Sequence, residues 1–424
     1  MESTPMVRML AVAAALLVVG ACARTERLPA SFYDGENADH YEQLATQLKS
    51  TQVDLLYVTD REPEHDEEGK LHYGVGRSQS LAFGSIVVEL DETRSWKELV
   101  AWTRSEEPGN PAPNPEVVSV TELGRFPDTP FPVVLDDFGQ VVTSPETEDK
   151  HARARDSAMG ELSRRLVLTE RNAVWVSVHG VQTEFEEGAE IIAMTWHQRG
   201  RWGVPIYYSW PAGQSGFISG YSYDRESGEF TIFHLKQLLR GLAGVPEIES
   251  INLFAHSRGA DVLLSAIREL IIEARAAGHD PRTLFNFGHL VLVAPDMDME
   301  VATQRIVAEG VGRGMKHVTL YVSDQDWAIG LAQSLFSSKR RVGQMNPDDL
   351  TEMQKRLFRK VGNVDLIFYR GSAGGSFGHS YYETPEVLSD IFLLGEGRSA
   401  GAEHGRPLEP VGPHLWVIRD GYAP

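Results

Sequence analysis

One short stretch of the chain, residues 251–264, constrains its fold more than any other. Residues 251–254 are apolar and β-prone, the chain turns at Ala255-His256-Ser257-Arg258-Gly259, and apolar side chains then recur at helical spacing. A strand, a tight turn centred on a serine and a helix are typical of a nucleophile elbow, in which the serine hydroxyl projects from the end of a sheet. Ala255 replaces the first glycine of the usual G-x-S-x-G pattern. The alternative is that Ser257 only caps the helix that follows.

Strands and helices alternate from about residue 150 onward, and the strands are almost continuously apolar. This pattern predicts an α/β fold with a mostly parallel, doubly wound sheet covered on both faces. The expected strands are 173–178, 204–209, 250–254, 290–294, 318–322 and 364–369, and the expected helices are 153–166, 185–199, 224–242, 259–276, 299–308, 326–336 and 385–394.

The N-terminus has the form of a secretory signal. Arg8 precedes an apolar run over residues 9–19, which is too short to span a bilayer, and small residues then lead to Cys22. This arrangement resembles the lipobox of bacterial lipoproteins, and Cys22 is the only cysteine in the chain. We therefore expect a signal peptide over residues 1–22 and a lipid anchor on Cys22. The alternative is a signal peptide that is cleaved at another position, so that Cys22 is removed with it or remains a free thiol.

The rest of the chain divides into four parts by composition and pattern. Residues 23–50 are polar and read as a tether, and 51–150 as a β-rich N-terminal extension in which residues 60–70 form a charged loop. Residues 151–395 hold the α/β pattern, and 396–424 form a C-terminal tail that ends in one docked strand or turn. The formal net charge of −20 argues against nucleic acid as a partner, because phosphate contacts need a basic surface.

Polar residues follow the predicted strands at the edge of the sheet where doubly wound folds place their sites. Their order along the chain is a serine, then acidic residues, then a histidine, as in α/β-hydrolases. The residues concerned are His179-Gly180-Val181-Gln182, Ser257, Asp296, Asp298, Asp324, Asp326 and His379, the last in a Gly/Ser-rich loop over 371–379.

The chemistry of acyl transfer explains why these residue types would be needed together. A serine hydroxyl is a poor nucleophile unless a base takes its proton, and a histidine oriented by a carboxylate can do so. Ser257, His379 and Asp326 fill these roles. The tetrahedral intermediate needs backbone donors, which we expect from the N–H of Arg258 and that of Val181 or Gln182.

The acid is the member of this triad with the most alternatives. Asp326 is preferred to Asp324, whose other role is to cap a turn. Asp296 and Asp298 provide a further alternative acid or, with Glu300, a weak metal site, but helix capping explains them better.

Other polar and aromatic residues near the site have structural explanations. We expect His179 and His256 to pack within their turns, and Trp210 either to wall the substrate or to cap the sheet edge. No H-E-x-x-H motif or cysteine cluster indicates a metal, and no cofactor is expected.

Seven motifs, spread along the chain in this order, can be read together. They are Val178-His179-Gly180-Val181-Gln182-Thr183-Glu184-Phe185-Glu186, Tyr208-Ser209-Trp210-Pro211, Tyr223-Asp224-Arg225-Glu226-Ser227, Ala255-His256-Ser257-Arg258-Gly259, Ala294-Pro295-Asp296-Met297-Asp298, Ser323-Asp324-Gln325-Asp326-Trp327-Ala328 and His379-Ser380-Tyr381-Tyr382. Through these motifs the sequence from about Val53 to Leu394 resembles the alpha/beta hydrolase family known as DUF900, whose function is not assigned at family level. The resemblance implies a serine-hydrolase fold and esterase-like chemistry without implying a substrate. This chain has Gln182 where the family commonly has Asn, and Arg258 where it commonly has Met or another residue.

Two functions from different classes fit these observations. The first is a serine hydrolase that cleaves a small-molecule or lipid carboxylic ester through a covalent acyl-enzyme. The second is a non-catalytic binding or scaffold lipoprotein that has kept the fold. Either protein would be held at the membrane of the bacterial cell envelope through Cys22, and Ala23 after this cysteine favours the outer membrane over the inner one.

Overall fold

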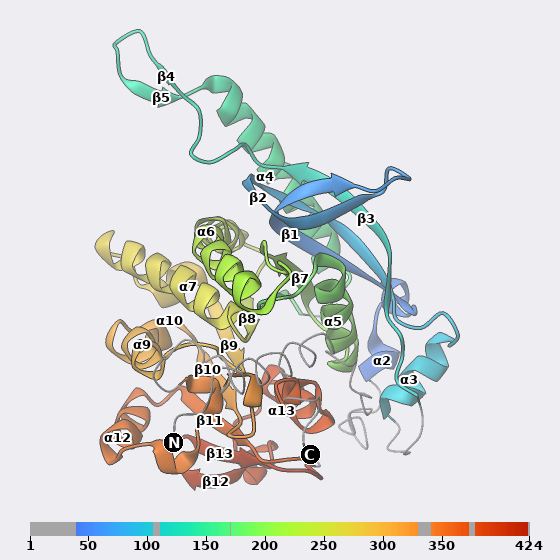
Figure 1. The fold of residues 1–424 in the computed structure, drawn as a ribbon, viewed down its shortest axis with the longest axis vertical. Coiled ribbons are helices and arrows are strands. Elements are labelled where there is room, and N and C mark those ends of the chain that lie inside the picture. Colours follow the sequence, from blue (N-terminus) through green and yellow to red (C-terminus); the bar gives the residue numbers. More distant parts are fainter. Residues whose placement is uncertain (1–39, 105–110, 170, 330–340, 373–377, 423–424) are drawn as a thin grey trace, which may run out of the picture.

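A computed structural model describes residues 40–104, 111–169, 171–329, 341–372 and 378–422 of the chain. The described residues form one large sheet between two layers of helices (Figure 1). This architecture is the α/β fold that the alternation of strands and helices predicts. No helix within the described ranges is both long and apolar enough to cross a membrane.

The sheet runs in the order β12-β13-β11-β10-β9-β8-β6-β7-β1-β2-β3. Neighbouring strands from β13 to β1 are parallel, and the pairs β1–β2, β2–β3 and β12–β13 are antiparallel. The strands are β1 (Gln52–His65), β2 (Leu71–Glu89), β3 (Glu116–Arg125), β6 (Ala173–Val178), β7 (Val204–Ser209), β8 (Ser250–His256), β9 (Phe287–Val293), β10 (His317–Val322), β11 (Val364–Tyr369), β12 (Glu409–Gly412) and β13 (Leu415–Ile418).

Helices cover both faces of the sheet because its central strands are apolar on both sides. Every residue of β6, β7 and β11 is buried. One face packs against α4 (Pro145–Leu166), α6 (Phe217–Ala243), α7 (Gly259–Ala276), α8 (Pro281–Phe285), α9 (Met299–Thr303), α10 (Val311–Gly314) and α12 (Glu352–Val361). The other packs against α2 (His40–Gln43), α3 (Trp96–Arg104), α5 (Phe185–Gln198) and α13 (Pro385–Gly395).

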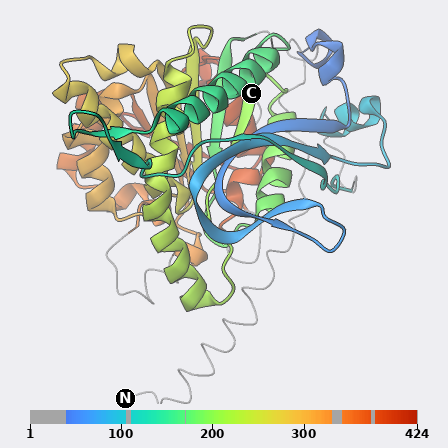
Figure 2. The ribbon, with the colours of Figure 1, turned by 90° about the horizontal axis from the view of Figure 1, so that it is seen from above.

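The N-terminal extension continues the sheet beyond β7. β1 pairs in parallel with β7 through Leu56 and Ile206, and with β2 it forms a long ribbon that curls away from the α/β body (Figure 2). The charged loop expected over residues 60–70 is therefore shorter than predicted, because β1 extends to His65 and β2 begins at Leu71. In this segment Asp60 and Arg61 are buried, whereas Glu62, Glu64 and His65 are exposed at the end of the strand.

The helix α4 joins this extension to the α/β part of the chain. It begins at Pro145, eight residues before the predicted start at Arg153, and Ser144 caps its N-terminus by accepting a hydrogen bond from Thr147 N–H. A small separate hairpin of β4 (Val133–Leu135) and β5 (Val141–Thr143) precedes it and projects beyond the end of the helix (Figures 1 and 2).

The C-terminal tail adds two strands to the sheet, of which β13 is the docked strand expected over residues 415–418. The tail is fixed by a buried ion pair. Arg406 donates to both oxygens of Asp390 at 3.0 and 2.6 Å, and the hydroxyls of Tyr321 and Tyr422 donate to the same carboxylate. A fully buried carboxylate needs such partners, so the tail is part of the folded body.

Two further predicted helices have other bounds in the structure, and one helix was not predicted. The helix expected from residue 224 begins at Phe217, and the helix expected over 299–308 is α9 followed by η2 (Gln304–Ala308), a π-helical turn. The sequence pattern gave no prediction for α12, although Thr351 and Gln354 form a capping box at its start. Most of the helix expected over 326–336 lies outside the described residues.

Candidate active site

The turn after β8 has the geometry of a nucleophile elbow. Ser257 has a φ of 54°, in the left-handed region that non-glycine residues rarely adopt. Helix α7 begins directly after the turn, with Arg258 at its N-cap and no capping side chain. The alternative of Ser257 as a helix cap is therefore not what the structure shows. Strained backbone of this kind clusters at functional sites.

The elbow lies in close contact with the loop that follows β6. A Cβ atom added to Gly259 would lie 2.3 Å from the carbonyl oxygen of His179, and one added to Gly180 would lie 2.9 Å from Ser257 Cβ. Real Cβ atoms do not approach other atoms this closely. The two glycines thus let the loop and the elbow touch, which brings Gly180 and Val181 beside the serine.

The histidine and the acid predicted from the sequence are hydrogen-bonded to each other. His379 Nδ1 donates to Asp326 Oδ2 at 2.7 Å, and the Asp326 side chain is fully buried at the end of β10. Asp326 Oδ1 accepts a further hydrogen bond from Ile329 N–H at 3.1 Å. A carboxylate on Nδ1 fixes the tautomer of the imidazole and leaves Nε2 able to accept a proton.

The electrostatic setting of His379 suits a base that works near neutral pH. Burial alone would lower the pKa of His379, but the Asp326 carboxylate outweighs burial and the pKa is raised above its ordinary value. The His379 ring also contacts the ring of His256, the residue before the serine, at a centroid distance of 4.7 Å. Within the described residues no hydrogen bond joins Ser257 Oγ to His379, and such bonds are often long in unliganded sites.

A short segment after His379 anchors its loop to the sheet. The Tyr381 hydroxyl donates to the carbonyl of Tyr321 at 2.7 Å and accepts from Ala294 N–H at 3.0 Å. Gly378 has a φ of +64°, and a Cβ there would lie 2.5 Å from the carbonyl oxygen of Gln325. These contacts hold the histidine loop against the acid loop after β10.

Two backbone donors beside the serine have no acceptor among the described residues. They are the N–H groups of Arg258 and Val181, the positions from which oxyanion donors are expected. The other expected donor, Gln182, is committed elsewhere because its N–H donates to Asp224 Oδ2 at 2.7 Å. Of the two alternatives expected in this loop, the Gln182 N–H is therefore occupied, whereas within the described ranges the Val181 N–H is not.

Asp224 on α6 holds the loop after β6 in place, and it was not among the site residues predicted from the sequence. Its buried carboxylate accepts the N–H groups of Gln182, Gly213 and Gln214 at 2.7, 3.3 and 3.4 Å. Burial raises the pKa of Asp224 although these donors oppose the shift. The acidic residue thereby holds Gln182 in its left-handed conformation, φ 54°, next to Val181.

Arg61 on β1 supports the same loop from the N-terminal extension. The buried guanidinium donates to the carbonyls of Thr183 and Ala212 at 2.8 and 2.7 Å and to Ser209 Oγ at 2.8 Å. Asp224 and Arg61 both lie far from the elbow in sequence. No local signal marks them, because Arg61 stands in the charged run that begins at residue 60 and Asp224 stands among the polar residues 224–227. Only the fold shows that these charges are buried and need partners.

The other acidic candidates have separate tasks. Asp324 is exposed and accepts a hydrogen bond from Asn346 at 2.8 Å. Asp298 caps α9, as expected, by accepting from the N–H groups of Glu300 and Val301. Asp296 does not cap a helix. Its buried carboxylate pairs with Arg341 and accepts the Tyr221 hydroxyl at 2.8 Å.

Burial and the neighbouring Arg61 hold His179 neutral, in the structural role expected for it. Burial, together with the Arg61 guanidinium, lowers the pKa of His179 to about 3. Nε2 therefore accepts from Trp210 N–H at 3.1 Å, and Nδ1 donates to the carbonyl of Gly180 at 2.8 Å. Trp210 stacks on this ring and is fully buried, so it packs against the loop and does not form an exposed substrate wall.

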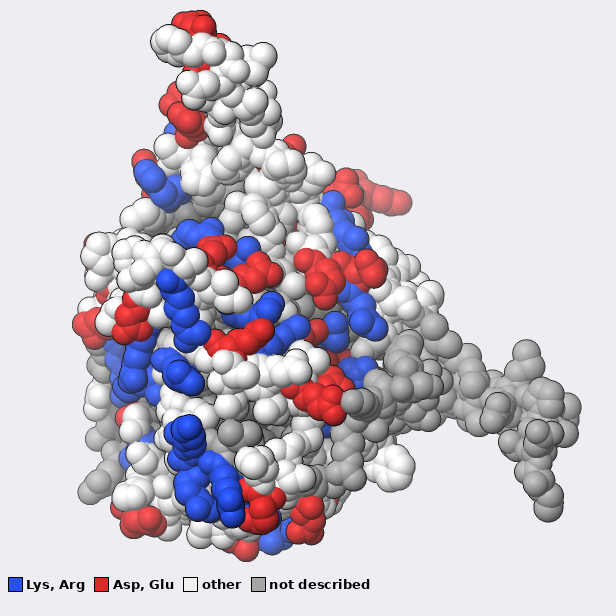
Figure 3. All heavy atoms as spheres, turned by 90° about the vertical axis from the view of Figure 1, so that its left-hand side faces the viewer, with Lys and Arg blue, Asp and Glu red and all other residues white. Residues whose placement is uncertain are grey.

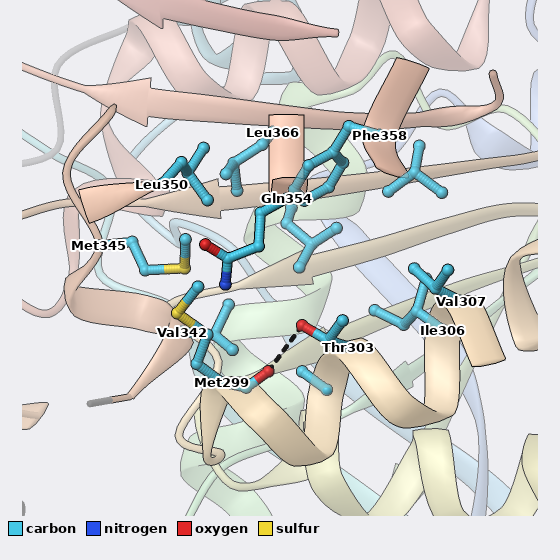
Figure 4. A pocket seen from close by; sticks show the side chains of 13 residues that line it. Met299, Thr303, Ile306, Val307, Val342, Met345, Leu350, Gln354, Phe358 and Leu366 are labelled. Carbon is cyan, nitrogen blue, oxygen red and sulfur yellow. Dashed lines mark hydrogen bonds between the residues drawn. The ribbon is translucent and has the colours of Figure 1, made fainter. Parts of the chain in front are cut away.

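Two hollows in the structure lie away from the serine. An apolar pocket of about 40 Å³ between α9, η2 and α12 is lined by Met299, Ile306 and Phe358 among others (Figure 4). It has room for a few water molecules and is far below the roughly 300–1,000 Å³ of typical ligand sites. A larger hollow of about 470 Å³ lies at the amino ends of β1 and β7, whereas Ser257 lies at the carboxyl end of β8.

Two further predictions concern metals and the N-terminus. Among the described residues, no group of three or more His, Cys, Asp or Glu side chains could hold a metal ion. Cys22 and the expected signal peptide lie outside the described residues, as does most of the expected tether.

The contact between the elbow and the loop after β6 predicts the effect of Gly259→Ala. The added methyl would collide with the His179 carbonyl, so we expect a loss of about 1–3 kcal/mol in the free energy of unfolding, measured by urea denaturation. Gly160→Ala is the control, because nothing lies within 4 Å of its Cβ position in the exposed part of α4. We expect Gly160→Ala to stabilise by about 1 kcal/mol. Wild-type stability for Gly259→Ala would contradict the described contact.

Comparison with known families gives one match, which covers most of the α/β part. Residues 154–396 match the model of DUF900, described as an alpha/beta hydrolase of unknown function. No curated protein and no solved structure matches the chain. The matched region contains the elbow, the acid and the histidine.

Proposed function

The chain belongs to the DUF900 family of alpha/beta hydrolases, and we propose that it is a serine hydrolase that cleaves carboxylic esters. The observation that carries the proposal is the His379–Asp326 hydrogen bond at 2.7 Å, formed beside an elbow that holds Ser257 in a left-handed conformation. A pair of this kind alone is not specific, because His234 is also paired with the buried carboxylate of Asp60 at 2.9 Å. The strained serine beside His379 is what sets the His379–Asp326 pair apart.

The proposed reaction takes place in two acyl transfers. Ser257 Oγ attacks the ester carbonyl carbon while His379 Nε2 takes the hydroxyl proton, and Asp326 stabilises the imidazolium that forms. The carbonyl oxygen becomes an oxyanion that accepts hydrogen bonds from Val181 and Arg258 N–H. His379 then gives its proton to the departing alcohol. Water, deprotonated by His379, attacks the acyl-enzyme and releases the acid with Ser257 restored.

The residues around the triad position it without touching the substrate in this scheme. Asp224 holds the oxyanion loop through Gln182, and Arg61 holds the same loop through Thr183. The guanidinium of Arg258 pairs with Asp261 at 2.7 Å, so only its backbone N–H is assigned to the oxyanion. The donors are thus fixed before the substrate binds, which is the condition for strong electrostatic stabilisation.

A fluorophosphonate probe tests the nucleophile directly. We expect the folded wild-type protein to be labelled and Ser257→Ala to be unlabelled, with ester hydrolysis reduced by a factor of about 10³ or more because the nucleophile is lost. Ser265→Ala is the matched control. Ser265 lies on α7, the helix that follows the elbow, and its hydroxyl donates a hydrogen bond to the carbonyl of Asp261. Equal labelling of wild type and Ser257→Ala would contradict the proposal, and a wholly unlabelled wild type would favour a non-catalytic binding protein.

The acid is tested by the pH dependence of Asp326→Asn. Only neutral His379 can act as a base, and the facing carboxylate raises the pKa of His379. In the wild type, kcat/KM should therefore fall on the acid side through a pKa above the ordinary histidine value of about 6.5. In Asp326→Asn the pKa of His379 should be lower, so kcat/KM should fall only at a lower pH than in the wild type. The value of kcat should also be reduced by a factor of about 10⁴. Asp324→Asn is the control and should keep the wild-type pH profile. If Asp326→Asn shows the same pKa on the acid side of its kcat/KM profile as the wild type, Asp326 is not the acid of the triad.

We further propose that the protein is held at the membrane of the bacterial cell envelope, more specifically the outer membrane, through a lipid on Cys22. The support is the apolar run over residues 9–19 that ends at small residues before this only cysteine. Such an anchor would place the enzyme next to lipid esters as well as small soluble ones, and the acidic chain is not suited to nucleic acid.

Cys22→Ser tests the anchor in cells. The variant cannot accept the lipid, so we expect it to move from the membrane fraction to the soluble fraction while its esterase activity per molecule is unchanged. Fractionation followed by immunoblotting measures the shift. Membrane association equal to wild type would contradict the lipid proposal.

A further inference from the structure

The hairpin of β4 and β5 stands apart from the rest of the fold. It projects beyond α4, away from the sheet and the triad (Figure 1), and in the described part of the chain its two strands pair only with each other. Each strand has three residues. Two-stranded hairpins of this size are marginally stable in water unless further strands or a helix cover them.

Both faces of this hairpin are apolar and exposed to solvent. Val133 and Leu135 are 60% and 70% exposed, Val141 is 67% exposed, and Phe138 at the turn is 87% exposed. Val134 lies between the first two and is 43% exposed, and successive side chains of a strand point to opposite faces. An uncovered apolar ribbon of this kind marks an interaction site.

The outer edge of β5 is open for pairing with another strand. Asp136 N–H donates to Gln140 O at 2.9 Å and Ser144 N–H to Pro132 O at 3.4 Å, on either side of the Val134–Val142 pair. Backbone groups alternate in direction along a strand, so those of Val141 and Thr143 point away from β4.

The two edges of the hairpin differ in how well they are protected. Residues 140–144 of the β5 side, Gln-Val-Val-Thr-Ser, contain neither a charge nor a proline. The β4 side, Pro-Val-Val-Leu-Asp over residues 132–136, carries the charge of Asp136. Charges are a usual device against edge pairing, so the β5 edge is the less protected of the two.

We propose that the β5 edge binds the same edge of a second copy of this chain. An antiparallel pairing centred on Val142 places Val141 of one copy opposite Thr143 of the other. These residues can exchange both backbone hydrogen bonds of a bonded pair, and within the paired residues 140–144 no charge meets a like charge. The arrangement has a two-fold axis at Val142 and so closes as a dimer. It also doubles the strand number of the small sheet.

The position of the hairpin removes the main objection to self-association, which is the net charge of −20. The charged bodies are held apart by the two projections, and exposed charges separated by more than about 8 Å are largely screened at physiological salt.

A lipid surface is a poorer occupant of the same hairpin. Acidic side chains lie at the outer end of the projection (Figure 3), where Asp136 and Asp137 form the turn. Anionic lipid headgroups would repel these charges. Unpaired strand edges are also unfavourable in hydrocarbon, where no water can satisfy the backbone groups.

Cysteine cross-linking tests the two-fold axis. In the full-length chain with Cys22→Ser, Val142→Cys provides a single thiol, and directly opposed non-bonded residues have Cα atoms about 4.5 Å apart, within disulfide reach. Val134→Cys is the matched control on β4, where the two thiols of a dimer would lie about 14 Å apart. Under mild oxidation we expect about tenfold more disulfide dimer from Val142→Cys than from Val134→Cys, because only the first pair can meet.

Sedimentation velocity of the full-length protein in mild detergent provides the second readout. Wild type should form dimers as its concentration rises, and Val142→Lys should stay monomeric with the same unfolding midpoint, because lysine blocks edge pairing. Equal cross-linking of both cysteine variants, or a wild type that stays monomeric, would overturn the proposal. Binding of phosphatidylcholine vesicles without preferential cross-linking at residue 142 would overturn it in favour of a lipid occupant.

Discussion

The site depends on a close backbone contact between the loop after β6 and the elbow after β8. Gly259 meets the carbonyl of His179, and Gly180 meets Ser257, at distances that no larger residue allows. This contact sets a strained serine beside the N–H of Val181, which has no acceptor in the described part of the chain. The cost of the strain, on the order of 1–3 kcal/mol, is offset by the buried strands on either side.

Burial and charge give the histidines of the site different tasks. His179 is buried near Arg61, and its lowered pKa keeps it neutral as a fixed hydrogen-bonding link between Trp210 and Gly180. His379 faces a buried carboxylate that raises its pKa. The first histidine is therefore structural and the second can move a proton, although both follow strands at the same edge of the sheet.

Local pattern predicts the central part of this fold well and its periphery less well. The strands 173–178, 204–209 and 364–369 are buried on both faces, so their apolar runs mark their bounds. The charged residues 60–65 were expected in a loop but belong to β1, because the exposed charges at its end hide the strand pattern. The elbow, acid and histidine follow strand ends and could be chosen from sequence. Asp224 and Arg61 could not, since their partners are backbone groups that only the folded chain brings near.

We propose that Ser257, His379 and the two backbone donors act on one carbonyl group, and a crystal structure of a phosphonate adduct would show this directly. We expect phosphorus bonded to Ser257 Oγ, its oxyanion oxygen within hydrogen-bond distance of Val181 and Arg258 N–H, and His379 Nε2 facing the leaving-group side. Phosphorus on another residue would contradict the proposed mechanism, as would an adduct whose oxygen points away from both donors.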